Sequence, residues 1–294
     1  MKRKGIILAG GLGTRLYPLT NIYSKQLLPV YDKPMIYYPL STLMLINVRE
    51  ILIISTPEHI SAYENLLGAG KKLGMKIEYK VQPKPNGLAQ SLIISENFLQ
   101  GSSSVLILGD NIFHGGNLKN YLLKANNSNR ATIFATQVNK PQDYGIVDFD
   151  KSLKIKNLEE KPKKPKSNYA VAGIYFYDTK ASFYAKKIKP SKRGELEITD
   201  LNKIYLKKKK LNLQLLDESV LWLDSGTHGS LVDASEYFYT IEKRTGIKSA
   251  CIEEIAFRNK WINKDQLKKM ALKHINSPYG KYLMKVYNRH NKYF

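Results

Sequence analysis

Near its N-terminus the sequence reads Gly5-Ile6-Ile7-Leu8-Ala9-Gly10-Gly11-Leu12-Gly13-Thr14-Arg15-Leu16, a short apolar run that leads into a glycine-rich loop. The apolar run predicts a buried strand, and the glycines permit a turn in which backbone N–H groups approach phosphate oxygens. The loop is not a dinucleotide-binding fingerprint, because position 16 is Leu, and it lacks the Gly-Lys-Ser/Thr ending of a Walker A loop. Arg15 adds a guanidinium suited to bidentate phosphate contact. The stretch therefore predicts a phosphate site of another kind, with a purely structural turn as the alternative.

Strand and helix patterns alternate through the first two-thirds of the chain. The predicted strands are residues 5–10, 51–56, 77–82, 105–110 and 132–138, and the predicted helices are residues 36–46, 60–67, 88–99 and 118–125. This order predicts a Rossmann-like α/β fold, in which a mixed, mostly parallel sheet carries helices on both faces. Ligands of such sheets bind beyond the carboxyl ends of the strands, which here are residues 10–15, 82–87 and 110–111.

The pattern changes from Tyr144 onward. Residues 144–150, 153–158, 169–177 and 211–216 are further predicted strands, residues 161–166 a loop, and residues 198–206 a helix. After Thr227 apolar residues recur at helical spacing, and the chain is predicted to be helical to its end. We expect an α/β core over residues 1–230 and a C-terminal helical layer, residues 231–294, packed on that core.

Composition limits the class of protein. The chain has 294 residues, a net charge of +22 and one cysteine, Cys251, so an internal disulfide is excluded. The N-terminal apolar run is too short for a signal peptide, and no segment approaches the ~20 apolar residues of a membrane span. We therefore expect a soluble, cytoplasmic protein with no membrane contact. The positive charge indicates either a solvated coat of lysines or a nucleic-acid surface; the scattered lysines favour the first interpretation and argue against a nucleic-acid partner.

Three more charged residues are candidates for phosphate chemistry. Lys25 follows the glycine loop closely, although most lysines are simply solvated. Asp110 ends an apolar strand near that loop, where a carboxylate suits Mg²⁺, which binds one or two carboxylates together with substrate phosphates. Asp224 precedes a predicted helix. For both aspartates the alternative is a helix cap.

Longer segments occur in a fixed order along the chain. They are the glycine loop, Ser24-Lys25-Gln26-Leu27-Leu28-Pro29, residues 31–40, Gln82, Gly87-Leu88-Ala89-Gln90, Leu108-Gly109-Asp110-Asn111, Glu159-Glu160-Lys161-Pro162 and residues 193–200. In these segments the sequence resembles the glucose-1-phosphate thymidylyltransferase branch of the sugar nucleotidyltransferases, from about residue 4 to about residue 260.

The resemblance implies a role for each matching residue. The implied nucleotide-binding residues are Gly10, Gly13, Thr14, Arg15, Lys25, Gln26, Gln82, Gly87 and Asp110. Those implied for the sugar phosphate are Asn111, Tyr144, Gly145, Glu160, Lys161, Val171 and Arg193. Asp110 and Asp224 would hold Mg²⁺, and Arg15, Lys25, Asp110 and Lys161 would be catalytic. The resemblance also implies a homotetramer in dTDP-rhamnose biosynthesis, which serves cell-surface polysaccharide, and feedback inhibition by a dTDP-sugar.

The implied reaction joins dTTP to glucose 1-phosphate. The attacking phosphate is already largely dianionic at neutral pH, because its second pKa is near ~6, so no general base is expected. Positioning and charge neutralisation should therefore supply the catalysis, and losing one charge donor should lower the rate on the order of 10²–10³.

The sequence departs from the family pattern at four positions, Leu12, His114, Ala172 and Ser225. Two alternatives remain open at this stage. One is a sister uridylyl-, cytidylyl- or adenylyltransferase; the other is a basic nucleic-acid-binding or regulatory protein on the same fold.

Overall fold

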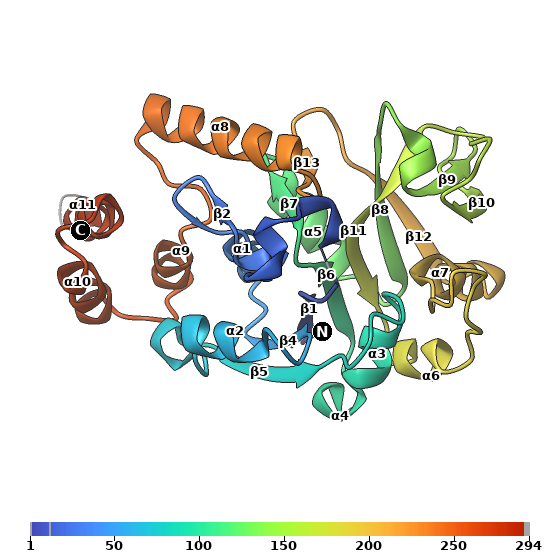
Figure 1. Cartoon of the computed structure of the whole chain (residues 1–294), viewed down its shortest axis with the longest axis horizontal. Helices are drawn as coiled ribbons and strands as arrows, with labels where there is room; N and C mark the ends of the chain where they lie inside the picture. Colours follow the sequence, from blue (N-terminus) through green and yellow to red (C-terminus); the bar gives the residue numbers. More distant parts are fainter. Residues whose placement is uncertain (1, 12, 291–294) are drawn as a thin grey trace.

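The computed structural model describes residues 2–11 and 13–290, so the departure at Leu12 lies outside the described residues. Within them the chain builds a nine-stranded sheet with the order β10-β9-β11-β6-β1-β4-β5, in which β8 pairs with β11 and β12 pairs with β8 (Figure 1). The strands are β1 (Lys4–Leu8), β4 (Glu50–Ser55), β5 (Lys76–Val81), β6 (Ser104–Leu108), β8 (Ala131–Gln137), β9 (Gly145–Phe149), β10 (Ile155–Glu160), β11 (Tyr169–Tyr177) and β12 (Leu211–Leu215).

The direction of the strands confirms the mixed, mostly parallel sheet. β1 runs parallel to β4 and β6, β4 parallel to β5, and β8 parallel to β12. β11 is antiparallel to β6, β8 and β9, and β10 is antiparallel to β9. Of the strands described in this sheet, β10 and β11 therefore run against the others. The strand predicted from residue 153 begins later, at Ile155, because the Asp150 carboxylate accepts from the N–H groups of Ser152 and Lys154 and closes a turn.

Successive side chains of the central strands bury into opposite faces of the sheet. Ile7 joins one hydrophobic cluster, whereas Ile6 and Leu8 join another. Both faces are thus covered, which confirms the predicted helices on both sides. The covering helices are α1 (Tyr37–Leu45), α2 (Ile60–Leu67), α3 (Gln90–Ile94), α4 (Glu96–Leu99), α5 (Leu118–Asn126), α6 (Ala181–Ala185) and α7 (Ile198–Lys207). The single helix predicted over residues 88–99 is wrong; it divides at Ser95, whose hydroxyl donates back to the Leu92 carbonyl.

The C-terminal part is helical, as predicted. It comprises α8 (His228–Thr245), α9 (Ile252–Arg258), α10 (Lys264–Lys273) and α11 (Pro278–His290). α9 packs on α1, and α10 packs on α11 at the left of Figure 1. The division expected after residue 230 falls inside the first turn of α8, and its status as a domain boundary stays a prediction.

Two short ribbons were not predicted. β2 (Pro29–Val30) pairs with β3 (Lys33–Pro34), and β7 (Asn111–His114) pairs with β13 (Leu221–Asp224). Strands of two to four residues are too short to show alternation in a sequence.

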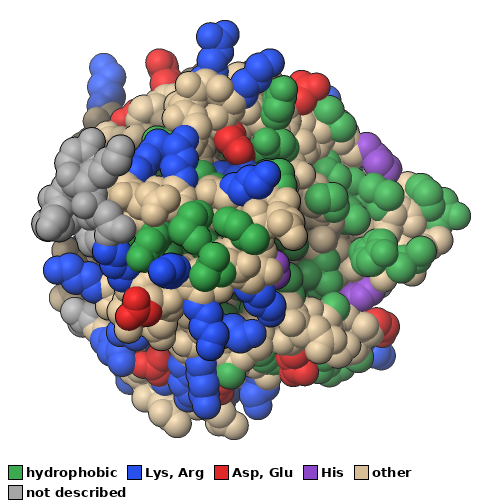
Figure 2. Space-filling view, turned by 90° about the vertical axis from the view of Figure 1, so that its left-hand side faces the viewer, with side chains coloured by type: hydrophobic (Ala, Val, Ile, Leu, Met, Phe, Trp, Pro, Cys, Tyr) green, Lys and Arg blue, Asp and Glu red, His purple; other side chains and the backbone are tan. Residues whose placement is uncertain are grey.

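The surface agrees with scattered rather than clustered charge on the face shown in Figure 2, where lysines and arginines stand among other side chains. Among the described residues, no helix has both the length and the apolar character needed to cross a bilayer.

Arg3 is a buried cation that holds the end of the sheet together, since its side chain is only 3% exposed. Its guanidinium donates to the backbone carbonyls of Asn126, Ser104, Tyr177 and Ser128. We expect Arg3→Met to lower the free energy of unfolding by about 2–4 kcal/mol, because the four carbonyls, in two buried and two partly buried hydrogen bonds, lose their donor. Urea denaturation measures this.

The matched control is Lys2→Met, which removes a neighbouring cation whose side chain is 81% exposed and pairs with Glu50 at the surface. An exposed pair contributes about 1 kcal/mol or less, so its unfolding midpoint should barely move. Equal midpoints for the two variants would contradict the role given to Arg3.

Candidate active site

A cavity of about 450 Å³ opens beside the carboxyl ends of the central strands. Its walls come from the loop after β1, the start of β7, the facing ends of β9 and β10, the middle of β11, the loop before α7, and the segment from β13 into α8. The predicted residues that line it are Arg15, Asn111, Tyr144, Gly145, Glu160, Lys161, Val171, Arg193 and Asp224. The fold therefore brings together all the residues predicted for the sugar phosphate, with one predicted phosphate ligand and one predicted metal ligand.

Lys25 and Asp110 form an ion pair next to this cavity. The side chains are 11% and 19% exposed, so the pair is largely shielded from water. Burial alone would raise the pKa of the Asp110 carboxyl, but the charge of Lys25 and the hydrogen bonds from Lys25 and Asn111 outweigh it and lower that pKa. Asp110 is thus held as a carboxylate. The residue after it begins strand β7, so the interpretation of Asp110 as a helix cap is wrong.

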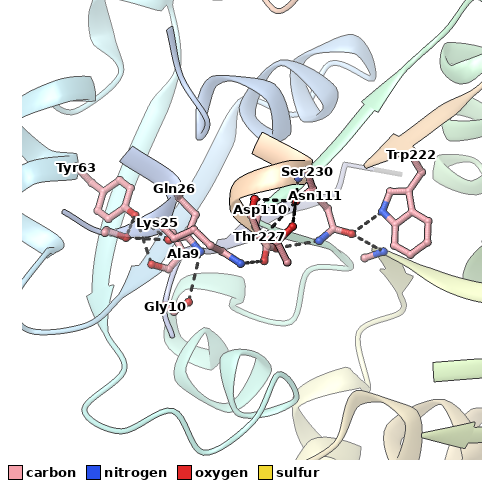
Figure 3. A network of polar contacts seen from close by, with 12 residues as sticks. Ala9, Gly10, Lys25, Gln26, Tyr63, Asp110, Asn111, Trp222, Thr227 and Ser230 are labelled. Atoms are coloured by element: carbon pink, nitrogen blue, oxygen red, sulfur yellow. Dashed lines mark hydrogen bonds and ion pairs between the residues drawn. The ribbon is translucent and has the colours of Figure 1, made fainter. Parts of the chain in front are cut away.

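Asn111 connects this ion pair to the cavity wall, as Figure 3 shows. Its amide nitrogen donates to Asp110 at 2.9 Å, and its amide oxygen accepts from the indole of Trp222 at 2.6 Å and from the backbone of Gly173 at 3.1 Å. Asn111 is only 3% exposed, and all three contacts fix its orientation. The position of the Asp110 carboxylate is therefore set by strands β7, β11 and β13 together.

Asp224 is the second carboxylate of the site. The β7–β13 pairing sets Asp224 opposite Asn111, and the backbone N–H of Ser225 donates to the Asp110 carbonyl at 3.1 Å. Burial raises the pKa of Asp224, and the negative charge of Asp110 raises it further, against the opposing charges of Lys25, Arg15 and Lys161. The alternative that Asp224 caps α8 is wrong, because Thr227 caps that helix by accepting from the N–H of Ser230.

Apart from Arg15, the residues predicted for the nucleotide do not line the cavity. Gln26 donates to the Gly10 carbonyl at 3.4 Å, and a Cβ added to Gly10 would lie 3.0 Å from the Gln82 amide oxygen. Gly13 has φ of +60°, and a Cβ added there would lie 2.7 Å from the Thr20 methyl carbon and 3.5 Å from the Lys25 Cβ. Thr14 begins a short 3-10 helix, residues Thr14–Leu16, and is exposed.

Gln82 donates to the Gly87 carbonyl at 3.3 Å, which joins two of the residues predicted for the nucleotide. Gly87 has φ of +99°, and an added Cβ would lie 2.5 Å from the backbone nitrogen and oxygen of Leu196. We expect Gly87→Ala to lower the free energy of unfolding by about 2 kcal/mol or more, because backbone strain and a backbone collision combine. Thermal unfolding measures the loss of stability, and nucleotide binding shows whether the loop at Gly87 still functions.

Gly101→Ala is the matched control. Gly101 has φ of +74°, yet an added Cβ would meet nothing within 4 Å, so that variant isolates the backbone strain. We expect it to lose about 1 kcal/mol and to bind nucleotide normally. If the two variants behaved alike, the close approach to Leu196 would have no consequence.

Sequence reasoning missed several residues of the cavity. Trp222 lies with its ring centroid 5.3 Å from that of Tyr144, and Thr199 donates to the Glu160 carboxylate. Burial raises the pKa of Glu160, although that hydrogen bond opposes the shift. Glu197 holds Arg193 at 3.0 Å. Thr199 and Glu197 lie in the segment 193–200 that carried the resemblance, which was the signal for them; Trp222 stands beside Asp224 but gave no separate signal.

The comparisons with known proteins agree with this geometry. A family model described as nucleotidyl transferase matches residues 4–240, a range that includes every site residue named above. The match defines the class: the chain is an enzyme of the nucleotidyl transferase kind.

Individual relatives narrow this class. A glucose-1-phosphate thymidylyltransferase of Xanthomonas campestris pv. campestris is 53% identical over 289 residues, which cover 98% of each chain. A protein of the same name from Mycobacterium tuberculosis is 47% identical over 97% of this chain and 99% of its own. A solved structure assigned to a glucose-1-phosphate thymidylyltransferase of Bacillus anthracis, in complex with sucrose, has a TM-score of 0.74 at 43% identity and covers 80% of this chain and 94% of its own. The chain belongs to the glucose-1-phosphate thymidylyltransferase family.

Proposed function

We propose that this enzyme transfers a thymidylyl group from dTTP to glucose 1-phosphate and releases pyrophosphate. A phosphate oxygen of glucose 1-phosphate attacks the alpha-phosphorus of dTTP and forms a new P–O bond. The bond from the alpha-phosphorus to the oxygen that bridges the alpha- and beta-phosphates breaks, and that oxygen leaves with pyrophosphate. The products are dTDP-glucose and pyrophosphate. The attacking phosphate needs no deprotonation at neutral pH, since its second pKa is near ~6.

One observation carries the proposal: cations and two carboxylates from distant parts of the sequence meet around one cavity. Arg15, Lys161 and Arg193 line it, and the Lys25–Asp110 pair stands next to it. Two polyanionic substrates repel each other, so a site that joins them needs fixed positive charge on several sides. The site offers that charge.

The residues present fit a Mg²⁺ ion. Asp110 and Asp224 are like-charged carboxylates close enough for Asp110 to raise the pKa of Asp224, and a divalent cation relieves such repulsion. The described residues contain no group of three or more acidic, histidine or cysteine side chains that could hold a metal, so phosphates and water would complete the coordination. When bound, Mg²⁺ supplies neutralisation of phosphate charge.

The chain's own residues hold and orient the sugar phosphate. Lys161 has φ of +43°, and its backbone N–H donates to the Tyr144 carbonyl at 3.0 Å, which anchors the residue beside the cavity. Glu160, held by Thr199, is an acceptor for sugar hydroxyl groups. The Tyr144 ring and the Trp222 indole form an apolar wall that excludes water from the reacting phosphates.

Pyrophosphate release from dTTP and glucose 1-phosphate, with and without Mg²⁺, tests the proposal. We expect release that requires both substrates and the metal. The same assay with UTP, CTP and ATP tests the sister activities, and a clear preference for UTP would overturn the thymidylyl assignment. Salt-dependent DNA binding without any pyrophosphate release would favour the nucleic-acid alternative.

Arg15→Ala is expected to lower kcat/KM by about 10². The Arg15 side chain is exposed and lies against Gly226, beside Asp224, so its charge is partly screened by water and its effect should fall at the low end of the expected range. Steady-state pyrophosphate release measures the change. The control is Arg244→Ala, which removes an exposed arginine in the last turn of α8, outside this cavity, and should keep normal kinetics.

We also propose, from the same resemblance, a homotetramer that acts early in a dTDP-rhamnose type of deoxysugar synthesis and is inhibited by a dTDP-sugar. Light scattering with the purified chain tests the assembly, and inhibition kinetics test the feedback.

A further inference from the structure

A second cavity, of about 810 Å³, lies at the edge of the sheet away from the active site. It is bounded by the end of α5, the edge strand β12 with its neighbour β8, the turn between β9 and β10, and the end of α7. β12, α7 and the β9–β10 hairpin stand together at the right of Figure 1. The two cavities share no lining residue, so this one has no part in the proposed reaction.

The charge of this cavity is of one sign. Lys124, Arg130, Lys154, Lys207 and Lys209 line it, and no Asp or Glu does. Within residues 2–11 and 13–290, none of these five cations forms an ion pair, whereas Lys25, Lys33 and Lys248 elsewhere are paired with carboxylates. Uncompensated cations around a hollow create a local positive potential that attracts anions.

Two further features concern residues that line the cavity, Thr132 and Arg130. The Thr132 hydroxyl is buried and has no hydrogen-bond partner in the part of the chain that the structure describes, although buried polar groups are almost always satisfied. The Arg130 guanidinium donates to the backbone carbonyl of Lys209, which holds it at the rim before any ligand arrives. A cation fixed in this way loses less conformational entropy on binding.

We propose that this cavity binds an oligophosphate, meaning a linear chain of two or more phosphates, either free or as the tail of a nucleoside triphosphate. Five cations spread around one hollow match an anion whose charge is distributed along its length better than a single phosphate. Arginine and lysine are the side chains that bind phosphate oxygens best. The volume lies within the range of ~300–1,000 Å³ of small-molecule sites.

Hydrogen exchange of the full-length protein with added tripolyphosphate tests the proposal, because it reports where the anion binds. We expect slower exchange in the segments 152–155 and 207–214, which contribute lining residues to this cavity, separately from any protection of the glycine loop at residues 10–15. In the triple variant R130Q/K207Q/K209Q, the tripolyphosphate concentration that gives half-maximal protection of these two segments should rise about tenfold or more. Protection of the glycine loop should stay as in the wild type, so the result does not depend on the proposed function.

The control variant K71Q/K119Q/K189Q removes the same charge from three exposed lysines outside the cavity. It should keep the protection within about twofold, and both variants should match the wild-type far-UV circular dichroism. A parallel titration with ATP identifies the source, since stronger protection by ATP indicates a nucleotide tail and stronger protection by tripolyphosphate a free chain. Three results would overturn the proposal: no protection at these segments, equal protection by sulfate at the same ionic strength, or stronger protection by a short DNA duplex than by tripolyphosphate.

Discussion

Lys25→Ala is expected to lower the turnover of dTTP and glucose 1-phosphate by about 10³, the largest loss among the cations of the site. Lys25 is 11% exposed and pairs with Asp110, so water screens its charge little. The substitution also takes the cation away from a largely shielded carboxylate, which costs about 1–3 kcal/mol of stability. Pyrophosphate release at saturating substrate, together with urea denaturation, separates the two effects.

Lys33→Ala provides the comparison that isolates the catalytic part. Lys33 is 3% exposed and pairs with Asp32, so its removal also breaks a shielded ion pair, but it lies outside the active-site cavity. Turnover per folded molecule should stay near the wild-type value in Lys33→Ala and fall in Lys25→Ala. If Lys25→Ala lowered stability but kept normal turnover per folded molecule, the role of Lys25 in charge neutralisation would be rejected.

Asp110→Asn is expected to lower turnover by about 10³ and to remove most of its dependence on Mg²⁺. The amide keeps the shape of the side chain, but it cannot offer a negative oxygen to a divalent cation. It also deprives Lys25 of its counter-charge. Turnover measured across a Mg²⁺ titration tests this, and an unchanged titration curve would rule out Asp110 as a ligand.

Asp217→Asn makes the same chemical change outside the active-site cavity. Hydrogen bonds from Ser219, Tyr121 and Asn117 lower the pKa of Asp217 to about 2, so it too is a firmly ionised carboxylate. Its replacement should leave the Mg²⁺ titration as it is in the wild type. A shift of equal size in both variants would point to a general effect of net charge.

The strands that end at the glycine loop and at Asp110 could be predicted because both are continuous apolar runs closed by glycine or aspartate. Such runs predict buried parallel strands, and the carboxyl ends of parallel strands lie at the same edge of a sheet. The glycine loop and Asp110 are therefore expected to lie close together. The break at Ser95 could not be predicted, because a serine inside an apolar helix pattern is common and only the contact with Leu92 shows that it ends one helix.

The second carboxylate shows the limit of sequence reasoning at the site. Asp224 stands before a helix, where a cap is the ordinary interpretation, and only the pairing of β13 with β7 brings it beside Asp110. The Glu160–Thr199 contact likewise joins residues 39 positions apart, with strand β11 and helix α6 between them, and no local pattern records it. Long-range pairings of short segments depend on tertiary packing, so the roles of these residues came from resemblance rather than from spacing.

The pairing of β7 with β13, two strands of four residues each, determines when the site is completed during synthesis of the chain. The nine strands of the large sheet are complete once residue 215 has been made, but the acidic pair is not complete until residue 224 has left the ribosome and docked against residue 111. A nascent chain that stops before that point carries the glycine loop and one acid without the other. Chains truncated before residue 224 should therefore show no metal-dependent activity.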